Sequence, residues 1–306
     1  MVKIALIVLN YKQAQLTIDT IQSLLQINHK GFDFQIFLIN NNPPDESLAI
    51  FEDKYGKNNK ITILSSGANL GYAGGNNFGI KHALKLNFDY YLIINNDVIV
   101  DKNFLFNLYN TARLNKTPSI VGPKIYFASG YEYHKDRYKK SEIGKVIWSA
   151  GGTMDWKNVY GSNQGVDEVD RGQHDKQITN LDFITGCCFL VPKEIFLSVG
   201  PFDEKYFMYL EDVDFCQRVK KKGYQLIYEP KAFIWHVNSG SSGSGSALHD
   251  YFITRNRLMF GFKYASFRTK FALVREAIKM IFIGRQWQKI AVIDYYVKHL
   301  GKGSWK

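Results

Sequence analysis

Three carboxylates stand within five positions of one apolar segment, MYLEDVDF at residues 208–215. Glu211, Asp212 and Asp214 repel one another when ionised, and their apolar neighbours raise the free energy of the charged forms. One explanation is catalytic, because a carboxylate near a helix N-terminus stays ionised and can act as a general base. Asp212 is then the candidate base, while Asp214 faces another way in the first turn. The alternative is a charge cluster that only stabilises a helix N-terminus.

A second group of polar residues ends a predicted buried strand. Asn95, Asn96 and Asp97 offer two neutral amides and one carboxylate, which suit a hard divalent cation that also contacts substrate phosphates. His236 follows another buried strand, where a lone histidine more often has a structural role. A cation near a diphosphate, opposite Asp212 as the base, is typical of group transfer from a nucleotide-activated donor.

Alternating strand and helix patterns in the first 100 residues must position these groups. Apolar runs predict strands at residues 3–11, 32–42, 60–66 and 90–97, and helical spacing predicts helices at 14–27, 48–55 and 78–86. This alternation predicts an α/β fold with a Rossmann-like, mostly parallel sheet flanked by helices. Ligands bind beyond the carboxyl ends of such strands, where the sequence places Asn10-Tyr11, Asn40 to Asn42, Gly67 to Asn77 and Asn95 to Asp97. Turn preference explains any one of these clusters but not all four together.

The second half of the chain is less regular. Residues 128–180 are polar and glycine-rich, which predicts a long excursion over the active face. The remaining pattern predicts strands at 181–192, 224–229 and 232–237, and helices at 192–199 and 213–222. The Gly/Ser-rich stretch at 239–247 has the composition of a linker or of a mobile loop that closes over substrate.

Composition excludes several classes of protein. With 45% hydrophobic and 22% charged residues, the chain is typical of globular proteins. No apolar run approaches the roughly 18 residues that a membrane span requires, and the short N-terminal run predicts a buried strand rather than a signal peptide. The three cysteines, an odd number without framework spacing, favour a cytoplasmic setting. Cys187 and Cys188 lie in a buried run and are expected to be packing residues.

Positive charge is concentrated at the C-terminal end. Residues 255–306 contain 12 Lys and Arg but two acids, a net charge of +10 out of +11 for the whole chain. Aromatic and aliphatic residues are interleaved with these cations, which favours a basic amphipathic helical extension on an anionic membrane surface. A solvated basic face is the alternative. No recognised nucleic-acid motif accompanies the charge, so no nucleic-acid partner is expected.

Eight motifs in order make the sequence similar to the family-2 glycosyltransferases of glycosyltransferase-A fold, particularly their bacterial rhamnosyltransferase-like branch. Between residue 4 and about residue 257 they read IVLNYK, INNNPPDES, NLGYAGGNNFGI, YYLIINNDVIV, WSAGG, TGCCFLVPKEIF, VGPFDEKYFMYLEDVDFCQRVKKKGY and YEPKAFIWHV. We therefore expect a catalytic domain at 1–254, with a nucleotide-binding half at 1–100 and an acceptor-binding half at 101–254. A basic helical extension follows at 255–306. The resemblance implies inverting transfer from a nucleoside-diphosphate sugar with Mg²⁺ or Mn²⁺.

The resemblance also implies roles for individual residues. Asp212 matches the catalytic base and Glu211 a residue that orients the acceptor, while Asp97 and His236 match the metal site. The positions expected to contact the donor nucleotide are Asn10, Tyr11, Asn40, Gly71, Gly74, Gly75, Asn76, Asn95, Asn96 and Arg255. Trp148 is the candidate for stacking on an acceptor sugar. Asn40 and Asn95 stand where the family often has acids, which leaves the base preference of the donor site open.

The expected reaction is transfer of rhamnose from dTDP-rhamnose to a saccharide or polyprenyl-linked saccharide in bacterial surface polysaccharide synthesis. The expected location is the inner face of the cell membrane, as a peripheral protein that is compatible with a homodimer. Two alternatives stay open on the sequence alone. One is a UDP-hexose-dependent transferase of the same fold. The other is a non-catalytic nucleotide-sugar binder or a basic membrane-associated scaffold.

Overall fold

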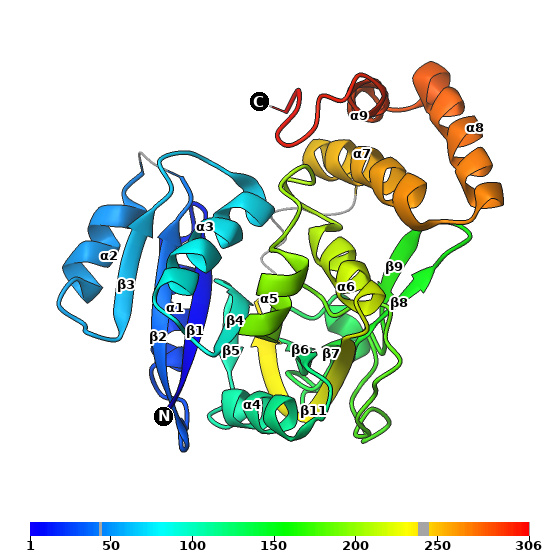
Figure 1. The fold of residues 1–306 in the computed structure, drawn as a ribbon. Coiled ribbons are helices and arrows are strands. Elements are labelled where there is room, and N and C mark those ends of the chain that lie inside the picture. The colour runs from blue at the N-terminus through cyan, green and yellow to red at the C-terminus, as the bar shows by residue number, and fades with distance from the viewer. Residues whose placement is uncertain (43–44, 238–244, 306) are drawn as a thin grey trace.

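The computed structural model describes residues 1–42, 45–237 and 245–305 (Figure 1). Nine strands in this part of the chain form one sheet: β1 (Val2–Asn10), β2 (Phe32–Asn40), β3 (Ile61–Ser65), β4 (Tyr90–Asn95), β5 (Val98–Val100), β6 (Ser119–Phe127), β7 (Ile147–Ser149), β10 (Cys188–Pro192) and β11 (Gln225–His236). Their order is β3-β2-β1-β4-β10-β6-β11-β5, with β7 paired to β6. The strands β8 (Gly152–Asp155) and β9 (Tyr160–Asn163) form a separate hairpin.

Strand direction brings the polar strand ends together. The strands β3, β2, β1 and β4 are parallel, and in their register Asn10 lies opposite Asn40 while Leu9 lies opposite Asn95. Strand β10 is antiparallel to β4 and β6, whereas β11 is parallel to β6 and antiparallel to β5. The prediction of a mostly parallel sheet is therefore confirmed for this half, and the carboxyl ends of its strands share one edge.

Helices cover both faces of the sheet: α1 (Ala14–Leu24), α2 (Ser47–Tyr55), α3 (Gly71–Lys85), α4 (Phe104–Leu114), α5 (Lys193–Val199) and α6 (Glu211–Lys221). Successive residues of a strand point to opposite faces. In β1, residues such as Leu6 and Val8 join the core shared with α1, α2 and α4. Ile7 and Leu9 instead join the core under α3, α5 and α6. Burial on both faces explains the continuous apolar runs of these strands.

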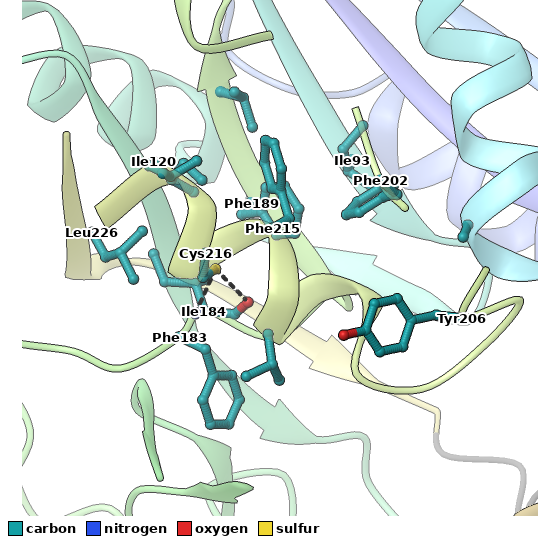
Figure 2. Close-up of a cluster of buried hydrophobic side chains, with 14 of the residues drawn as sticks. Ile93, Ile120, Phe183, Ile184, Phe189, Phe202, Tyr206, Phe215, Cys216 and Leu226 are labelled. Atoms are coloured by element: carbon teal, nitrogen blue, oxygen red, sulfur yellow. Dashed lines mark hydrogen bonds between the residues drawn. The ribbon is translucent and has the colours of Figure 1, made fainter. Parts of the chain in front are cut away.

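Helix α6, which carries the three carboxylates, is fixed to the sheet by aromatic packing (Figure 2). The ring of Phe215 stacks on Phe189 of β10 and on Phe196, with centroid distances of 6.2 and 5.4 Å. The next residue, Cys216, accepts a hydrogen bond from the backbone N–H of Ile184 at 3.4 Å. Full burial of such a ring stabilises the fold by about 2 kcal/mol, so the first turn of α6 has a rigid base.

Three further helices form the C-terminal part: α7 (Ala247–Tyr264), α8 (Phe267–Ile283) and α9 (Gln286–Tyr296). Ser246 and Ser266 cap α7 and α8 by accepting backbone N–H bonds from His249 and Thr269. In Figure 1, α7 lies beside α6, and α8 lies on the outer side of α7. Because α7 begins at Ala247, one continuous helix crosses the expected division after residue 254. None of the helices in the described residues is both long enough and apolar enough to cross a membrane.

Three local predictions were wrong, and two elements were missed. The strand predicted at 181–192 begins only at Cys188. The glycine-rich segment at 71–77 is not a loop but the first turns of α3, because Gly75 and Gly79 remove the Cβ atoms that would collide with side chains of β1 and β2. The strands expected at 224–229 and 232–237 are one strand, β11, with an irregularity between Glu229 and Phe233. Helix α4 and strand β6 were not expected. The Gly/Ser loop expected at 239–247 lies mainly outside the described residues.

Candidate active site

A chain of side-chain hydrogen bonds connects the ends of three strands. Asn96 donates to the hydroxyl of Thr17, which donates to Oδ1 of Asn10, both at 2.8 Å. Asn10 in turn donates to Oδ1 of Asn40 at 3.3 Å, and Asn40 donates to Asp45 at 3.1 Å. The structure therefore brings Asn10, Asn40 and Asn96 together as predicted. Thr17 and Asp45 were missed, although an acid five residues after Asn40 was a visible signal.

Asp45 supplies a carboxylate next to Asn40, the position where the family often has an acid. Asn40 is fully buried, and both atoms of its amide are bonded within this network. The carboxylate of Asp45 also accepts bonds from Asn42 at 3.3 Å and Ser47 at 3.1 Å. A negative charge is therefore present at this strand end, although residue 40 is neutral. Tyr11, the next residue after β1, is exposed beside it.

The first turn of α3 packs against the segment that precedes the carboxylates. Gly71 has a φ of +71°, and a Cβ atom there would collide with the backbone and ring of Phe207. Gly74 and Gly75 face Leu70 and Leu9 within the fold, so packing accounts for their small size. Asn76 is buried beside them. Its Oδ1 has no hydrogen-bond partner among the described residues, which leaves an acceptor available on this helix.

The carboxylates Glu211 and Asp212 form a coupled pair at the start of α6. Oδ2 of Asp212 accepts a hydrogen bond from the backbone N–H of Gly186 at 2.6 Å, and Oδ1 accepts one from Val213 at 2.8 Å. Burial raises the pKa of Asp212, while these two donors oppose the rise. Burial and the charge of Asp212 raise the pKa of Glu211 well above its usual range. Asp212 is therefore the member that ionises first.

Gly186 and Tyr72 support this pair and were not predicted. The hydroxyl of Tyr72 donates to the carbonyl oxygen of Gly186 at 2.5 Å. A Cβ atom at Gly186 would lie about 3.3 Å from Asp212 and 3.1 Å from Tyr72, so a larger residue would push these groups apart. The TGCC motif therefore places a backbone N–H donor against the candidate base.

Asp214 has a different environment from its two neighbours. It is fully buried and accepts bonds from Arg218 at 2.8 Å, Lys263 at 2.6 Å and Tyr264 at 2.8 Å. The prediction that Asp214 faces another way in the first turn is confirmed. Its bonds to Lys263 and Tyr264 fasten α6 to the end of α7.

We expect Asp214→Ala to lower the free energy of unfolding by about 3 kcal/mol, because it leaves two cations without their buried partner. Urea unfolding monitored by circular dichroism measures the effect. Asp33→Ala is the matched control, since the Asp33–Lys60 ion pair lies at the surface and such pairs contribute about 1 kcal/mol or less. Equal losses in the two variants would contradict the role of Asp214.

The candidate metal site lies where β5 pairs with β11. His236 pairs with Val98, and the N–H of Val237 donates to the carbonyl oxygen of Asp97 at 2.8 Å. As a result, Nε2 of His236 lies 3.2 Å from Oδ1 of Asp97. The ring of Trp148 meets the imidazole edge-on, with centroids 4.7 Å apart. The structure therefore brings Asp97, His236 and Trp148 together at one place.

The donor set of this place fits a hard cation bound jointly with a substrate. Oδ1 of Asn95, Oδ1 of Asp97 and Nδ1 of His236 are buried, and none has a hydrogen-bond partner in the described part of the chain. Within the same residues, no three His, Cys, Asp or Glu side chains are grouped closely enough to hold a metal alone. Mg²⁺ typically takes one or two carboxylates and completes its shell with water and phosphate oxygens. Asp97 supplies one such carboxylate, and His236 adds an imidazole nitrogen beside it.

The segment that precedes β10 connects the two sets of residues. Burial raises the pKa of the Cys187 thiol well above its usual range. Its carbonyl oxygen accepts the N–H of Asn95 at 2.9 Å. The preceding residue, Gly186, donates its N–H to Asp212, so adjacent residues of this segment contact the end of β4 and the first turn of α6. The thiol stays protonated, in agreement with a packing role.

Arg255 does not lie with the other expected donor-binding residues. It is fully buried, and its Nη2 donates to the carbonyl oxygens of Lys205 at 3.3 Å and Tyr206 at 3.1 Å. Its Nε donates to Asn256 at 3.1 Å. The guanidinium is thus engaged by the segment that leads to Glu211 rather than directed to the strand ends. Burial lowers its pKa, although the Tyr251 hydroxyl opposes that shift.

A strained turn precedes the carboxylates, and α7 holds it. Phe207, Tyr209 and Leu210 have φ angles of 63°, 68° and 68°. A left-handed conformation costs a residue other than glycine about 1–2 kcal/mol. The fully buried Asn256 of α7 donates from Nδ2 to three carbonyl oxygens of this turn, those of Tyr206 (2.9 Å), Met208 (2.7 Å) and Tyr209 (3.0 Å). Asn256 therefore helps to define where α6 begins.

We expect Asn256→Ala to lower kcat for sugar transfer by about 10²-fold while the KM for the donor stays near wild type, because displacing a catalytic group by about 1 Å costs that much. Steady-state kinetics measure both constants. Asn115→Ala is the control. It removes three similar bonds, to Thr117, Ser119 and Gln225, at the amino ends of β6 and β11. Equal kcat losses in both variants would mean that loss of stability alone explains the effect.

The sequence of residues 5–199 matches the family described as Glycosyl transferase family 2. The chain belongs to this family. Similar proteins include the low-salt glycan biosynthesis hexosyltransferase Agl10 of Haloferax volcanii, 25% identical over 213 residues, which cover 69% of this chain and 59% of that protein. The N-acetylglucosaminyl-diphospho-decaprenol L-rhamnosyltransferase of Mycobacterium tuberculosis is 27% identical over 197 residues, 62% of each chain. This chain therefore spans about three fifths of the length of these relatives.

The fold is also similar to a solved structure, that of GalNAc-T7 with UDP, GalNAc and Mn²⁺. The TM-score is 0.64, and the match covers 97% of this chain and 58% of that chain at 14% sequence identity. At this identity the similarity establishes the fold. It confirms the predicted glycosyltransferase-A architecture, a curled sheet with helices on both faces.

Proposed function

We propose that this glycosyltransferase family 2 chain is an inverting enzyme that transfers a sugar from a nucleoside-diphosphate donor to a hydroxyl of a saccharide or lipid-linked saccharide. One observation carries the proposal: two adjacent residues before β10 contact both carboxylate regions, because Gly186 donates its N–H to Asp212 and Cys187 accepts the N–H of Asn95, two residues before Asp97. In this proposal Asp212 lies on the acceptor side of the reacting sugar as the base, and Asp97 lies on the diphosphate side. Group transfer requires both.

Asp212 is the base in this proposal. Its carboxylate takes the proton of the acceptor hydroxyl as that oxygen attacks the anomeric carbon of the donor. The bond between the anomeric carbon and the diphosphate breaks in the same step, and its electron pair leaves with the diphosphate, so the configuration inverts. The N–H of Gly186, 2.6 Å from Oδ2, fixes the carboxylate. Glu211, whose raised pKa favours the neutral form, holds the acceptor by hydrogen bonding.

Asp97 and His236 would hold the Mg²⁺ or Mn²⁺ ion that the family usually requires. Such an ion, when bound, neutralises the charge that develops on the leaving diphosphate. Within the protein, Oδ1 of Asp97 and Nε2 of His236 lie 3.2 Å apart. In this proposal Trp148, whose ring meets that of His236 edge-on, stacks on the sugar of the acceptor.

The donor that we propose is dTDP-rhamnose, and the acceptor is a polyprenyl-linked saccharide at the inner face of the cell membrane. Support comes from the mycobacterial relative, which is named as a rhamnosyltransferase acting on a decaprenol-linked sugar. The basic C-terminal extension is compatible with such a location. A UDP-hexose donor is the second candidate, because the haloarchaeal relative is named as a hexosyltransferase.

A nucleotide-release assay tests this function. The donors are dTDP-rhamnose, UDP-glucose, UDP-galactose, UDP-N-acetylglucosamine and GDP-mannose, each with Mn²⁺ and with a chelator. Release from one donor that needs the metal would support a transferase and identify its sugar. Binding of a donor without release, measured by calorimetry in the presence of candidate acceptors, would instead favour a non-catalytic binder.

A further inference from the structure

Helix α8 has an apolar face that no part of the described chain covers. Thr269, Leu273 and Ala277 are buried against the rest of the protein. On the other side, four large apolar side chains at helical spacing are mostly exposed: Phe267 (88%), Phe271 (63%), Ile278 (55%) and Phe282 (74%). We call these four residues the outer apolar face of α8. Exposed apolar side chains are common singly, but a continuous stripe on one helix marks an interaction surface.

Three cations lie along one border of this face: Arg268, Arg275 and Lys279. Their spacing of seven and four residues places them on one side of the helix, next to the outer apolar face. None of them forms an ion pair within the part of the chain that the structure describes. The helix contains one acid, Glu276, and both of its carboxylate oxygens are bonded to Arg257. The exposed side of α8 is therefore cationic and apolar.

The position of α8 leaves this surface accessible. In Figure 1, α8 is at the periphery of the molecule, on the side of α7 that faces away from the central sheet. Its inner side packs on α7, where Leu273 lies against Gly261. The side opposite Leu273 and Ala277 consequently points outward.

We propose that the outer apolar face of α8 docks onto an anionic lipid surface, with Phe267, Phe271, Ile278 and Phe282 entering the headgroup–acyl boundary and Arg268, Arg275 and Lys279 meeting lipid phosphates. Amphipathic helices bind membranes by this combination of apolar area and positive charge. The inference rests on the membrane location in the proposed function and identifies the residues responsible for it. A second copy of the chain fits this surface less well, because a two-fold contact would bring equivalent rows of cations together.

Vesicle co-sedimentation of the full chain tests the proposal. We expect the wild-type protein to sediment with vesicles of phosphatidylcholine and phosphatidylglycerol, but not with phosphatidylcholine alone. The variant Phe271→Ser/Phe282→Ser should lose binding to the anionic vesicles. The variant Arg275→Glu/Lys279→Glu should bind the anionic vesicles at least about tenfold more weakly, since one cation near such a surface contributes about fivefold.

Matched variants separate this surface from general surface effects. Leu86→Ser/Leu114→Ser removes two other exposed apolar residues, and Lys57→Glu/Lys116→Glu reverses two other exposed cations. Both should sediment as the wild type does. Wild-type protein that stays in solution with anionic vesicles would overturn the proposal, and so would α8 variants that sediment normally. A dimer that Phe271→Ser/Phe282→Ser dissociates, seen by light scattering without vesicle binding, would assign the face to a second copy instead.

The test also separates this inference from the transfer reaction. Asp212→Asn should sediment like the wild type, because the first turn of α6 does not contribute to the outer apolar face. Normal vesicle binding with no sugar transfer from any donor would leave the docking surface intact and reject the proposed reaction. Transfer to a water-soluble acceptor without vesicle binding would support the proposed reaction and reject the docking surface.

Discussion

Asp212→Asn is expected to abolish sugar transfer, with kcat lowered by about 10³-fold or more, while donor binding stays near wild type. General base catalysis contributes about 10²–10⁴-fold to an enzymatic rate, and an amide cannot accept the proton of the acceptor hydroxyl. The side-chain oxygen of Asn can still accept the N–H of Gly186, so the geometry of the loop is retained. Nucleotide release and calorimetric donor binding measure the two quantities separately.

Glu211→Gln is the matched control for this variant. Because burial and the charge of Asp212 raise the pKa of Glu211, its carboxyl is favoured in the neutral form, which an amide imitates. This variant should keep kcat within about tenfold of wild type. Thermal unfolding of both variants should occur at or above the wild-type temperature, since each removes a carboxyl group that burial disfavours in its charged form. Near-normal turnover in Asp212→Asn would exclude Asp212 as the base.

The pH dependence follows from the direction of the Asp212 pKa. Burial raises it above its ordinary value, and transfer requires the ionised form. Activity should therefore fall as the pH decreases through this raised pKa, at a higher pH than an exposed aspartate would give. The residual activity of Asp212→Asn should not show this decrease at low pH.

Strand ends were the part of the site that the sequence predicted well. Buried apolar runs that end in Asn or Asp predict the position of these residues, because the carboxyl ends of parallel strands lie at one edge of the sheet. Asn10, Asn40, Asn96 and Asp97 all lie at that edge. Which amide bonds to which group depends on register, and the sequence alone does not specify it. For this reason the bridging hydroxyl of Thr17 was not anticipated.

The turn before α6 was not predictable for a different reason. Three residues other than glycine adopt positive φ there, against their local preference, and bonds from α7 about 50 residues later hold them. Local sequence patterns do not reveal a conformation that is imposed by tertiary contacts. Arg255 was expected at the diphosphate because it follows the histidine in the motif order. Its burial beneath the turn follows from the packing of α7, which its sequence neighbours do not reveal.

Asp97→Asn is expected to weaken Mn²⁺ binding in the presence of UDP or dTDP on the order of 10³-fold. At an effective dielectric constant near 20, a unit charge about 4 Å from another contributes about 4 kcal/mol. Electron paramagnetic resonance of the free Mn²⁺ signal measures this affinity without reference to turnover. Asp101→Asn is the control, because Asp101 accepts the N–H of Asn103 at the start of α4 and has no part in the site.

The same experiment distinguishes a metal site built by the protein from one completed by the donor. The position that often carries a second acid is occupied by the neutral Asn95, and the described residues provide Asp97 and His236 without a third His, Cys, Asp or Glu grouped with them. One carboxylate neutralises half of a divalent charge, so the diphosphate must supply the rest. We therefore expect the Mn²⁺ signal to remain that of the free ion until nucleotide is added, and His236→Gln to weaken the ternary complex less than Asp97→Asn. Tight Mn²⁺ binding without nucleotide, or unchanged binding in Asp97→Asn, would mean that the ion is held elsewhere.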